Sequence, residues 1–304
     1  MKNKLFYFSF IGCLSFSVYG EDYNGEMITH NLNNRYLSTP YACNDGASPY
    51  HCSGVIIRTL ELVGYPWSYG SYDTERDAMS FSFLRSDIGP HPLYNNSVTG
   101  KTGIILKPLD SISSEQQPYD FYCYYPIDAI THLRDHHGCG EFVKSKQIKA
   151  IALVEDESTC EAKGITTADE WISTMFDDIC SFSAQDPEQF KVSIEAQQKL
   201  PSDEFMWNEL VMNLWDISLP HNLPIEALWV NVDGETGEID EKGLATAQQG
   251  QIDMYNIANR YVPIVRFKEY YRPFPFVYIK DDQVITEPIQ PQNINNTSNP
   301  ELIG

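Results

Sequence analysis

Three short polar patterns in this sequence combine residue types that could act together on an anionic substrate. Arg58 closes an apolar, β-branched run in CSGVIIR, where a buried guanidinium needs an anionic partner such as a carboxylate or a phosphate. Ser80 and Ser82 lie two residues apart in SFSFLR, so a strand would place both hydroxyls on one face. Glu209 stands in WNELVMNLW, at the entrance of an apolar strand. Taken alone, each pattern also fits a simpler interpretation: an internal ion pair, ordinary half-buried serines and a surface acid.

Other residues with chemical potential lack the surroundings that their chemistry needs. Cys52, followed by Ser-Gly, resembles the nucleophile segment of NlpC-type cell-wall peptidases, but no histidine lies in the glycine-flanked apolar strand that such an enzyme would use. His132 and His136 have a spacing that suits zinc on a helix, but HLRDHH lacks the glutamate of a metallopeptidase. The acidic run 233–243 lacks the spacing of an EF-hand. We therefore expect no metal site.

Hydrophobic periodicity along the chain predicts an α+β fold. Residues 21–51 are polar and rich in turn formers, and we expect them to be irregular. Strands are expected at 80–84, 103–106, 121–127, 225–232, 262–267 and 274–279. Residues 55–58 predict a strand or the start of a short helix that runs to Val63, 205–214 a strand or a helix, and 148–154 are apolar. Helices are expected at 129–136, from Thr166 or Thr167 to about Cys180, at 187–199 and at 244–258.

The two ends of the chain differ in composition from its middle. Residues 1–20 have a basic start, an apolar stretch over 5–16 and a small-x-small cleavage site, which together predict a secretory signal peptide. Residues 281–304 are rich in Asn, Gln and Pro, which predicts a disordered polar tail. Residues 21–280 are then one catalytic or binding domain. Because no later apolar run is long enough to span a membrane, we expect a secreted protein, extracellular or periplasmic.

The cysteine count supports export. Cys13 leaves with the signal peptide, and six cysteines remain, which in an exported chain predicts three disulfides among fifteen possible pairings. We expect neighbours to pair, because each such bond closes a short loop: 43–52, 123–139 and 160–180. A disulfide at Cys52 would compete with any role as a nucleophile.

The charge of the chain excludes one class of partner. The formal net charge is -21, and losing Lys2 and Lys4 with the signal peptide makes it more negative. Such a chain repels nucleic acids and anionic membrane surfaces, since no basic patch offsets the acids. We therefore expect no nucleic-acid partner.

Taken in order, Arg58, Ser80-x-Ser82 and Glu209 resemble the Arg, Ser-x-Ser, Glu order of cholera-type ADP-ribosyltransferases. Longer blocks are similar to the halovibrin family of secreted bacterial ADP-ribosyltransferases, and they extend from about Leu32 to Phe267. They include CSGVIIR, SFSFLR, PIDAITHLRDHHGCG, GITTADEW, WNELVM, LPIEALW, GLATAQQGQIDMY and VPIV.

The resemblance implies a fold, a substrate and a set of roles. The fold would have mixed or antiparallel sheets with flanking helices, and NAD would be the substrate of a mono-ADP-ribosyltransferase that modifies a target protein, such as one in a host cell. Glu209 would stabilise positive charge on the ribose, and Ser80 would hold that glutamate in place. Arg58 would bind the NAD phosphate or ribose, and Ser82 would support the strand or the nicotinamide end. We expect a monomer that acts without a metal.

One position departs from the family pattern. Arginine-modifying members carry a second acid two residues before the catalytic glutamate, where this chain has Trp207. Water could then be the acceptor, which would make the protein an NAD glycohydrolase. Glu226, Gln248 and Gln251 are alternatives if Glu209 is not the catalytic residue. The alternative functions are a non-catalytic exported binding or colonisation protein and, further from the pattern, a cysteine peptidase that uses Cys52.

Overall fold

The computed structural model confirms a mixed α+β protein built on one nine-stranded, mostly antiparallel sheet. It describes residues 24–44, 47–59, 78–88, 102–107, 119–127, 159–177, 179–200, 208–214, 224–233, 236–268 and 273–286. The predicted signal peptide, the predicted helix at 129–136, the apolar segment 148–154 and Trp207 lie outside these residues.

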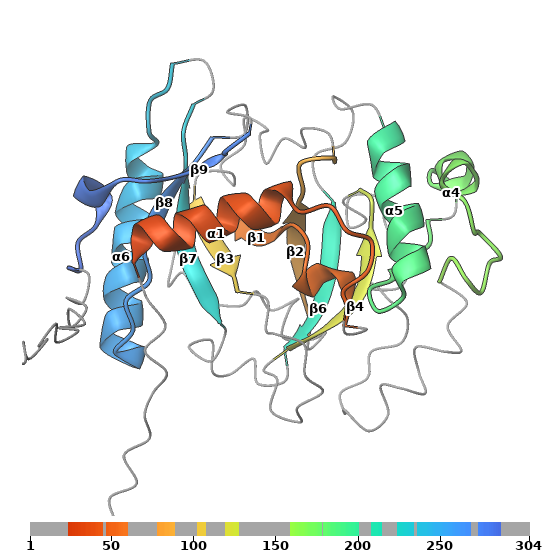
Figure 1. Ribbon diagram of the computed structural model, residues 1–304, viewed down its shortest axis with the longest axis horizontal. Helices are drawn as coiled ribbons and strands as arrows, with labels where there is room; N and C mark the ends of the chain where they lie inside the picture. Colours follow the sequence, from red (N-terminus) through yellow and green to blue (C-terminus); the bar gives the residue numbers. More distant parts are fainter. Residues whose placement is uncertain are drawn as a thin grey trace, which may run out of the picture.

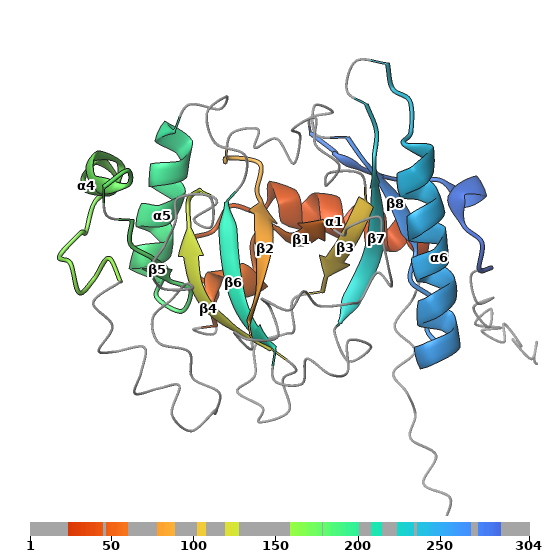
Figure 2. The same cartoon turned by 180° about the vertical axis from the view of Figure 1, so that it is seen from behind.

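The strand order in the sheet is β5-β4-β6-β2-β1-β3-β7-β8-β9. Only β7 and β8 pair in parallel, and the other neighbouring pairs are antiparallel. The strands are β1 Val55–Thr59, β2 Ala78–Leu84, β3 Thr102–Leu106, β4 Tyr119–Tyr125, β5 Phe182–Ser183, β6 Glu209–Leu214, β7 Ile225–Asn231, β8 Ile264–Phe267 and β9 Phe276–Tyr278. Seen from behind, β4, β6 and β2 lie side by side (Figure 2). The predicted strands at 80–84, 103–106, 121–127, 225–232, 262–267 and 274–279 are confirmed, and the two ambiguous segments, 55–58 and 205–214, each contribute a strand.

Helix α1, Gly25–Leu37, occupies a segment that we expected to be irregular, and this expectation is wrong. Its buried side chains Ile28, Leu32 and Tyr36 recur every four residues and pack on Ile57 of β1 and on neighbouring strands. The helix lies across the half of the sheet that runs from β9 to β1 (Figure 1). It fixes the face on which the side chains of Val55 and Ile57 are buried.

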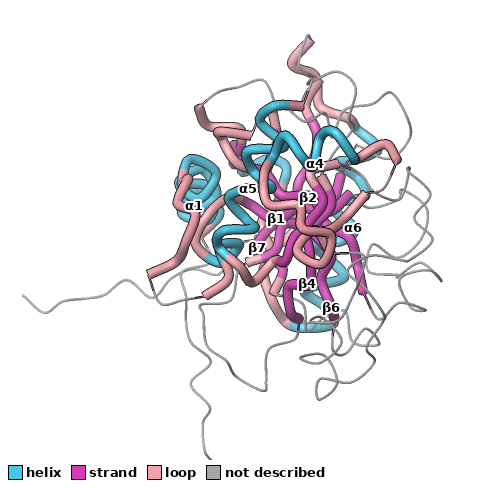
Figure 3. The backbone as a smooth tube through the Cα atoms, turned by 90° about the vertical axis from the view of Figure 1, so that its right-hand side faces the viewer, coloured by secondary structure: helices cyan, strands magenta, loops and turns pink. Residues whose placement is uncertain are grey.

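Helices α5, Pro187–Lys199, and α6, Glu241–Ala258, confirm two predicted helices. Asp186 caps α5 and Asp240 caps α6, each through its side chain. Residues of both helices join a hydrophobic cluster that contains Ile56 and not Ile57, so they cover the sheet face opposite α1. Seen end-on, α1 and α6 lie on opposite sides of the strands (Figure 3).

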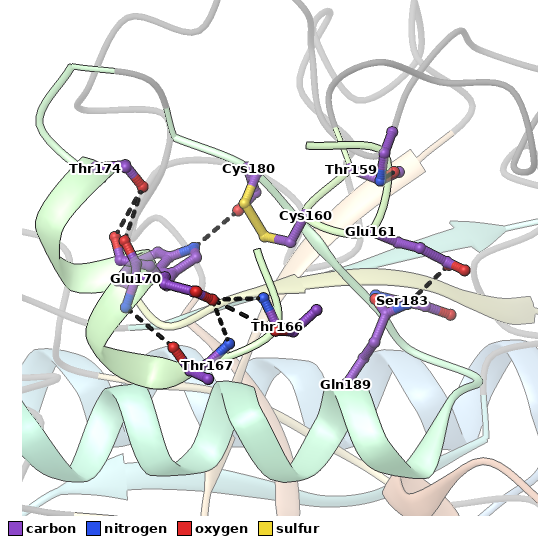
Figure 4. Close-up of a disulfide and its surroundings, with 12 residues drawn as sticks. Thr159, Cys160, Glu161, Thr166, Thr167, Glu170, Thr174, Cys180, Ser183 and Gln189 are labelled. Atoms are coloured by element: carbon purple, nitrogen blue, oxygen red, sulfur yellow. Dashed lines mark hydrogen bonds between the residues drawn. A yellow bond between two sulfur atoms is a disulfide. The ribbon is translucent and has the colours of Figure 1, made fainter. Parts of the chain in front are cut away.

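Helix α4, Ala168–Thr174, begins as predicted but ends about six residues earlier. Thr167 and Glu170 form a reciprocal capping box at its start (Figure 4). The Cys160–Cys180 disulfide follows, and the Trp171 indole donates a hydrogen bond to the carbonyl of Cys180 at 3.1 Å. The disulfide and this hydrogen bond hold Cys180 beside the helix, so the chain leaves the helix early and enters β5.

The disulfides support an oxidising environment for this protein. Cys43–Cys52 and Cys160–Cys180 are present, which confirms two of the three predicted pairings. Cys123 is also disulfide-bonded, and its predicted partner Cys139 lies outside the described residues. Within the described part of the chain, no helix is long and apolar enough to cross a membrane.

The first residues of the predicted polar tail belong to the folded domain. Residues 281–286 are packed on the domain: Asp282 is buried and pairs with Arg266 through two hydrogen bonds of 2.8 and 2.9 Å. Gln283 hydrogen-bonds both the N–H and the carbonyl of Ile264. The predicted boundary at residue 280 is therefore too early. Asp282 and Gln283 look solvated in sequence, but they hydrogen-bond the Arg266 side chain and the main chain of Ile264 in β8. Residues 287–304 lie outside the described part.

Candidate active site

The insertion of β6 between β4 and β2 brings Glu209 to Ser80. The Ser80 hydroxyl donates a hydrogen bond of 2.5 Å to Oε1 of Glu209, across 129 residues of sequence. Glu209 is 1% exposed, so its carboxylate lies inside the fold and not on its surface. A buried carboxylate held by a hydroxyl is the arrangement that the sequence pattern could only suggest.

The register shows which side chains surround Glu209. Tyr125 of β4 is its direct cross-strand partner, and continuing the β2–β6 register places Ser82 on its other side. These three side chains and that of Ser80 share one face of the sheet. Their neighbours in sequence, Phe81 and Leu210, point into the hydrophobic cluster on the opposite face. Ser82 is half-buried. Glu209 is thus flanked by an aromatic ring on one strand and by two serines on the next.

Arg58 reaches the same place from the other face. Alternation puts its side chain with Ile56, and its guanidinium carbon lies 5.8 Å from the centre of the Phe81 ring. Its Nη1 donates a hydrogen bond of 2.5 Å to the main-chain carbonyl of Ser80. Arg58, Ser80 and Glu209 therefore form one hydrogen-bonded chain, in which Ser80 contributes both its carbonyl and its hydroxyl.

The β1–β2 register explains why a side chain contacts that carbonyl. The last paired residues are Ile57 and Ser82, so main-chain pairing with β1 stops before Ser80 is reached. The Arg58 guanidinium provides a donor beyond this point. A charged donor on a main-chain oxygen is stronger than a neutral one and keeps the end of β1 in a defined position.

Gly103 of β3 positions Arg58 from its other side. The Trp229 indole of β7 donates a hydrogen bond of 3.1 Å to the carbonyl of Arg58, and it crosses β3 at Gly103. A Cβ atom at residue 103 would overlap both that carbonyl oxygen and the indole. Glycine is needed here because the indole takes the space that a side chain would fill.

We expect Gly103→Ala to lower the free energy of unfolding by about 1–3 kcal/mol, because the methyl group overpacks a rigid contact. It should also lower any activity that depends on Arg58. Urea unfolding with an unchanged slope measures the first effect. Gly164→Ala is the control: no atom lies within 4 Å of the added methyl, so only the left-handed backbone is strained. A Gly103→Ala protein as stable as the wild type would contradict this account.

The alternative site residues all have structural partners. Glu226 forms a two-fold ion pair with Arg35 of α1, in which one contact is 3.0 Å. Gln248 donates to the carbonyl of Asp282 at 3.1 Å. Gln251 is fully buried, donates to the carbonyl of Val262 and accepts from two main-chain N–H groups. These contacts join α1, β7 and the end of the chain, and none of them reaches Glu209.

Cys52 and the metal candidates have different outcomes. The Cys52 sulfur is bonded to Cys43, so it has no thiol to act as a nucleophile. His132 and His136 lie outside the described residues. Of the acidic run 233–243, the structure describes residues 233 and 236–243. No cluster of three or more His, Cys, Asp or Glu that could hold a metal ion occurs in the part of the chain that the structure describes.

Arg85 is a structural residue that the sequence patterns did not single out. Its side chain is fully buried, and it makes hydrogen bonds of 2.7 and 3.0 Å to the Asp87 carboxylate. It also donates to the carbonyls of Thr39 and Pro40 and lies over the Tyr41 ring, 4.9 Å from its centre. This guanidinium ties the end of β2 to the loop that follows α1. Its only sequence signal is an arginine directly after an apolar strand, the same signal as Arg58.

No protein-family model matches the chain, and no curated protein matches it. The fold and the site define a mixed α+β protein in which a half-buried serine holds a buried glutamate on two inner strands of the sheet.

Proposed function

We propose that this protein is a secreted NAD-dependent mono-ADP-ribosyltransferase, with water as an alternative acceptor in an NAD glycohydrolase reaction. The observation that carries the proposal is the hydrogen bond from Ser80 to the buried Glu209. A buried carboxylate that a hydroxyl holds in place can stabilise the positive charge that develops on a ribose when its glycosidic bond breaks. The sheet with its flanking helices is compatible with the ADP-ribosyltransferase-like fold that the sequence resemblance implies.

The proposed reaction uses each residue for a separate task. The bond between ribose C1′ and the nicotinamide nitrogen breaks, and its electron pair leaves with nicotinamide. An acceptor nucleophile on a target protein, or water, forms the new bond to C1′ and loses its proton. Glu209 stabilises the charged ribose, Ser80 orients Glu209, and Ser82 lies beside it on the same face. The Arg58 guanidinium lies on the other face of the sheet and holds the Ser80 carbonyl, and the sequence resemblance gives it the further task of binding a phosphate or ribose oxygen of NAD, for which a planar guanidinium is suited.

The route of export supports the same proposal. Two disulfides join described residues, Cys123 is also disulfide-bonded, and the sequence predicts a signal peptide before the domain. Such a protein would meet its acceptor outside the cytoplasm that made it, either in the periplasm or at another cell. The strongly acidic surface favours a protein acceptor over nucleic acid.

The purified mature protein is expected to release nicotinamide from NAD, either alone or with an added mixture of acceptor proteins. Radiolabel from the adenylate part of NAD would mark a transferase, and free ADP-ribose would mark a glycohydrolase. Calorimetry with NAD separates a third outcome: a binding protein without catalysis should show no heat of NAD binding. If no nicotinamide is released under any of these conditions, the enzyme proposal is wrong.

A further inference from the structure

We propose that Asn208 is a positioning residue that sets the location of the Glu209 carboxylate. This inference rests on the proposed function, and it concerns how the site is held and not which reaction it performs. Asn208 precedes β6 directly and is 1% exposed. Its side chain makes two hydrogen bonds to a single residue of β2, and both are short.

The two bonds replace one rung of the sheet. The main-chain N–H of Phe83 donates to Oδ1 of Asn208 at 2.7 Å, and Nδ2 of Asn208 donates to the carbonyl of Phe83 at 2.7 Å. A side-chain amide carries the same donor and acceptor as a peptide group, so it can continue the ladder. The main-chain pairing of β2 with β6 covers 78–81 and 210–213, and Asn208 extends it by one rung.

Glu209 lies between these two attachments. On the β2 side, Leu210 is paired with Phe81 through the main chain, and Asn208 is paired with Phe83 through its side chain. Adjacent Cα atoms are about 3.8 Å apart, so fixing both neighbours fixes the Cα atom of Glu209. The Ser80 hydroxyl then meets the carboxylate in one geometry. Without the Asn208 rung, the first residue of β6 would be held on the β4 side alone.

The rung also satisfies buried groups. Phe83 is fully buried, and an unpaired N–H or carbonyl is costly there. Loss of the Asn208 amide would therefore both destabilise the protein and release Glu209. A test of positioning must separate these two effects.

The chain itself provides a matched control in Asn33 of α1. Nδ2 of Asn33 donates to the carbonyl of Phe276 at 2.9 Å, and the N–H of Phe276 donates to its Oδ1 at 3.1 Å. Both asparagines are buried, and each pairs with the two main-chain groups of one phenylalanine in a strand. Asn33 contacts β9, at the edge of the sheet, whereas β6 is an inner strand that five other strands separate from β9.

The experiment compares Asn208→Ala with Asn33→Ala in the mature protein, by nicotinamide release over a range of NAD concentrations and by urea unfolding. Both variants should lose similar stability. We expect kcat to fall about 10- to 100-fold in Asn208→Ala with KM for NAD changed little, since a displacement near 1 Å at a reacting group can cost this much. Asn33→Ala should keep the kcat of the wild type. Equal kcat values in the two variants would overturn the proposal.

A structural measurement decides the inference even if NAD is not the substrate. A crystal structure of Asn208→Ala should show the hydrogen bond between Ser80 and Glu209 broken, and that of Asn33→Ala should show it intact. An intact bond in Asn208→Ala would overturn the positioning role, whatever the activity of the wild type. If Asn208→Ala fails to fold, Asn208→Asp replaces it, because aspartate keeps the shape and the acceptor but cannot donate to the Phe83 carbonyl when ionised.

Discussion

Replacing Glu209 by glutamine is expected to lower nicotinamide release from NAD by at least about 10²–10³-fold, because the site loses the negative charge that stabilises the ribose. Glutamine keeps the size of the side chain and an oxygen that can accept from Ser80, so the hydrogen bond at 2.5 Å has a replacement. The free energy of unfolding should therefore change little. Steady-state kinetics and urea unfolding on the same preparation measure both quantities.

Glu226→Gln is the matched control for this substitution. Glu226 is also a largely buried glutamate, but its partner is the Arg35 guanidinium. Losing its charge should lower stability, because Arg35 would keep a half-buried charge without its ion-pair partner. The turnover of the folded protein should stay at the wild-type value. The reverse pattern, with Glu226→Gln inactive and Glu209→Gln active, would show that the catalytic acid has been misassigned.

Replacing Arg85 by methionine is expected to lower the free energy of unfolding by about 3 kcal/mol, the lower end of the range for a broken buried ion pair. The lower end applies because the Asp87 side chain is 27% exposed and water can solvate it in part. Methionine retains much of the volume, but the carbonyls of Thr39 and Pro40 lose a buried donor. Chemical unfolding at constant pH measures this loss.

Lys199→Ala is the control for the charge that is removed. Lys199 pairs with Asp169 at 2.8 Å, but both side chains are largely exposed. Exposed pairs contribute at most about 1 kcal/mol, so this variant should unfold close to the wild type. If Arg85→Met were no more destabilised than Lys199→Ala, the fully buried guanidinium would not be an anchor of the fold.

Much of the secondary structure could be predicted, because buried strands and capped helices have local signals in the sequence. Val55 to Ile57 is a β-branched run, and Pro187 to Lys199 has a capping aspartate, a first-turn proline and a final lysine. Helix α1 was missed since its apolar residues Ile28, Leu32 and Tyr36 are separated by polar residues of modest helix propensity. The Asn24 cap and the four-residue spacing were the signals that could have revealed it.

The candidate site was predictable only in part. The residue types of Arg58, Ser80 and Glu209 suggested a set, but their contacts depend on β6 pairing with strands that are distant in sequence. Neighbouring strands in a sheet are often not neighbours in the chain, and no local pattern encodes that choice. Asn208 was missed for the same reason, because its partner lies 125 residues away. An asparagine before a strand otherwise indicates only a turn.

The central position of β6 has a consequence for the time at which this protein can become active. β2 and β4 precede β6 in the chain, yet β6 separates them in the sheet, so the sheet cannot close until residue 214 has been made. Contacts between distant segments form slowly, because a long loop must close before they are gained. A chain that is still being synthesised or exported therefore has Ser80 but no Glu209 beside it. Activity should appear only after β6 has paired with β2 and β4, and a truncated chain that ends before β6 should have none.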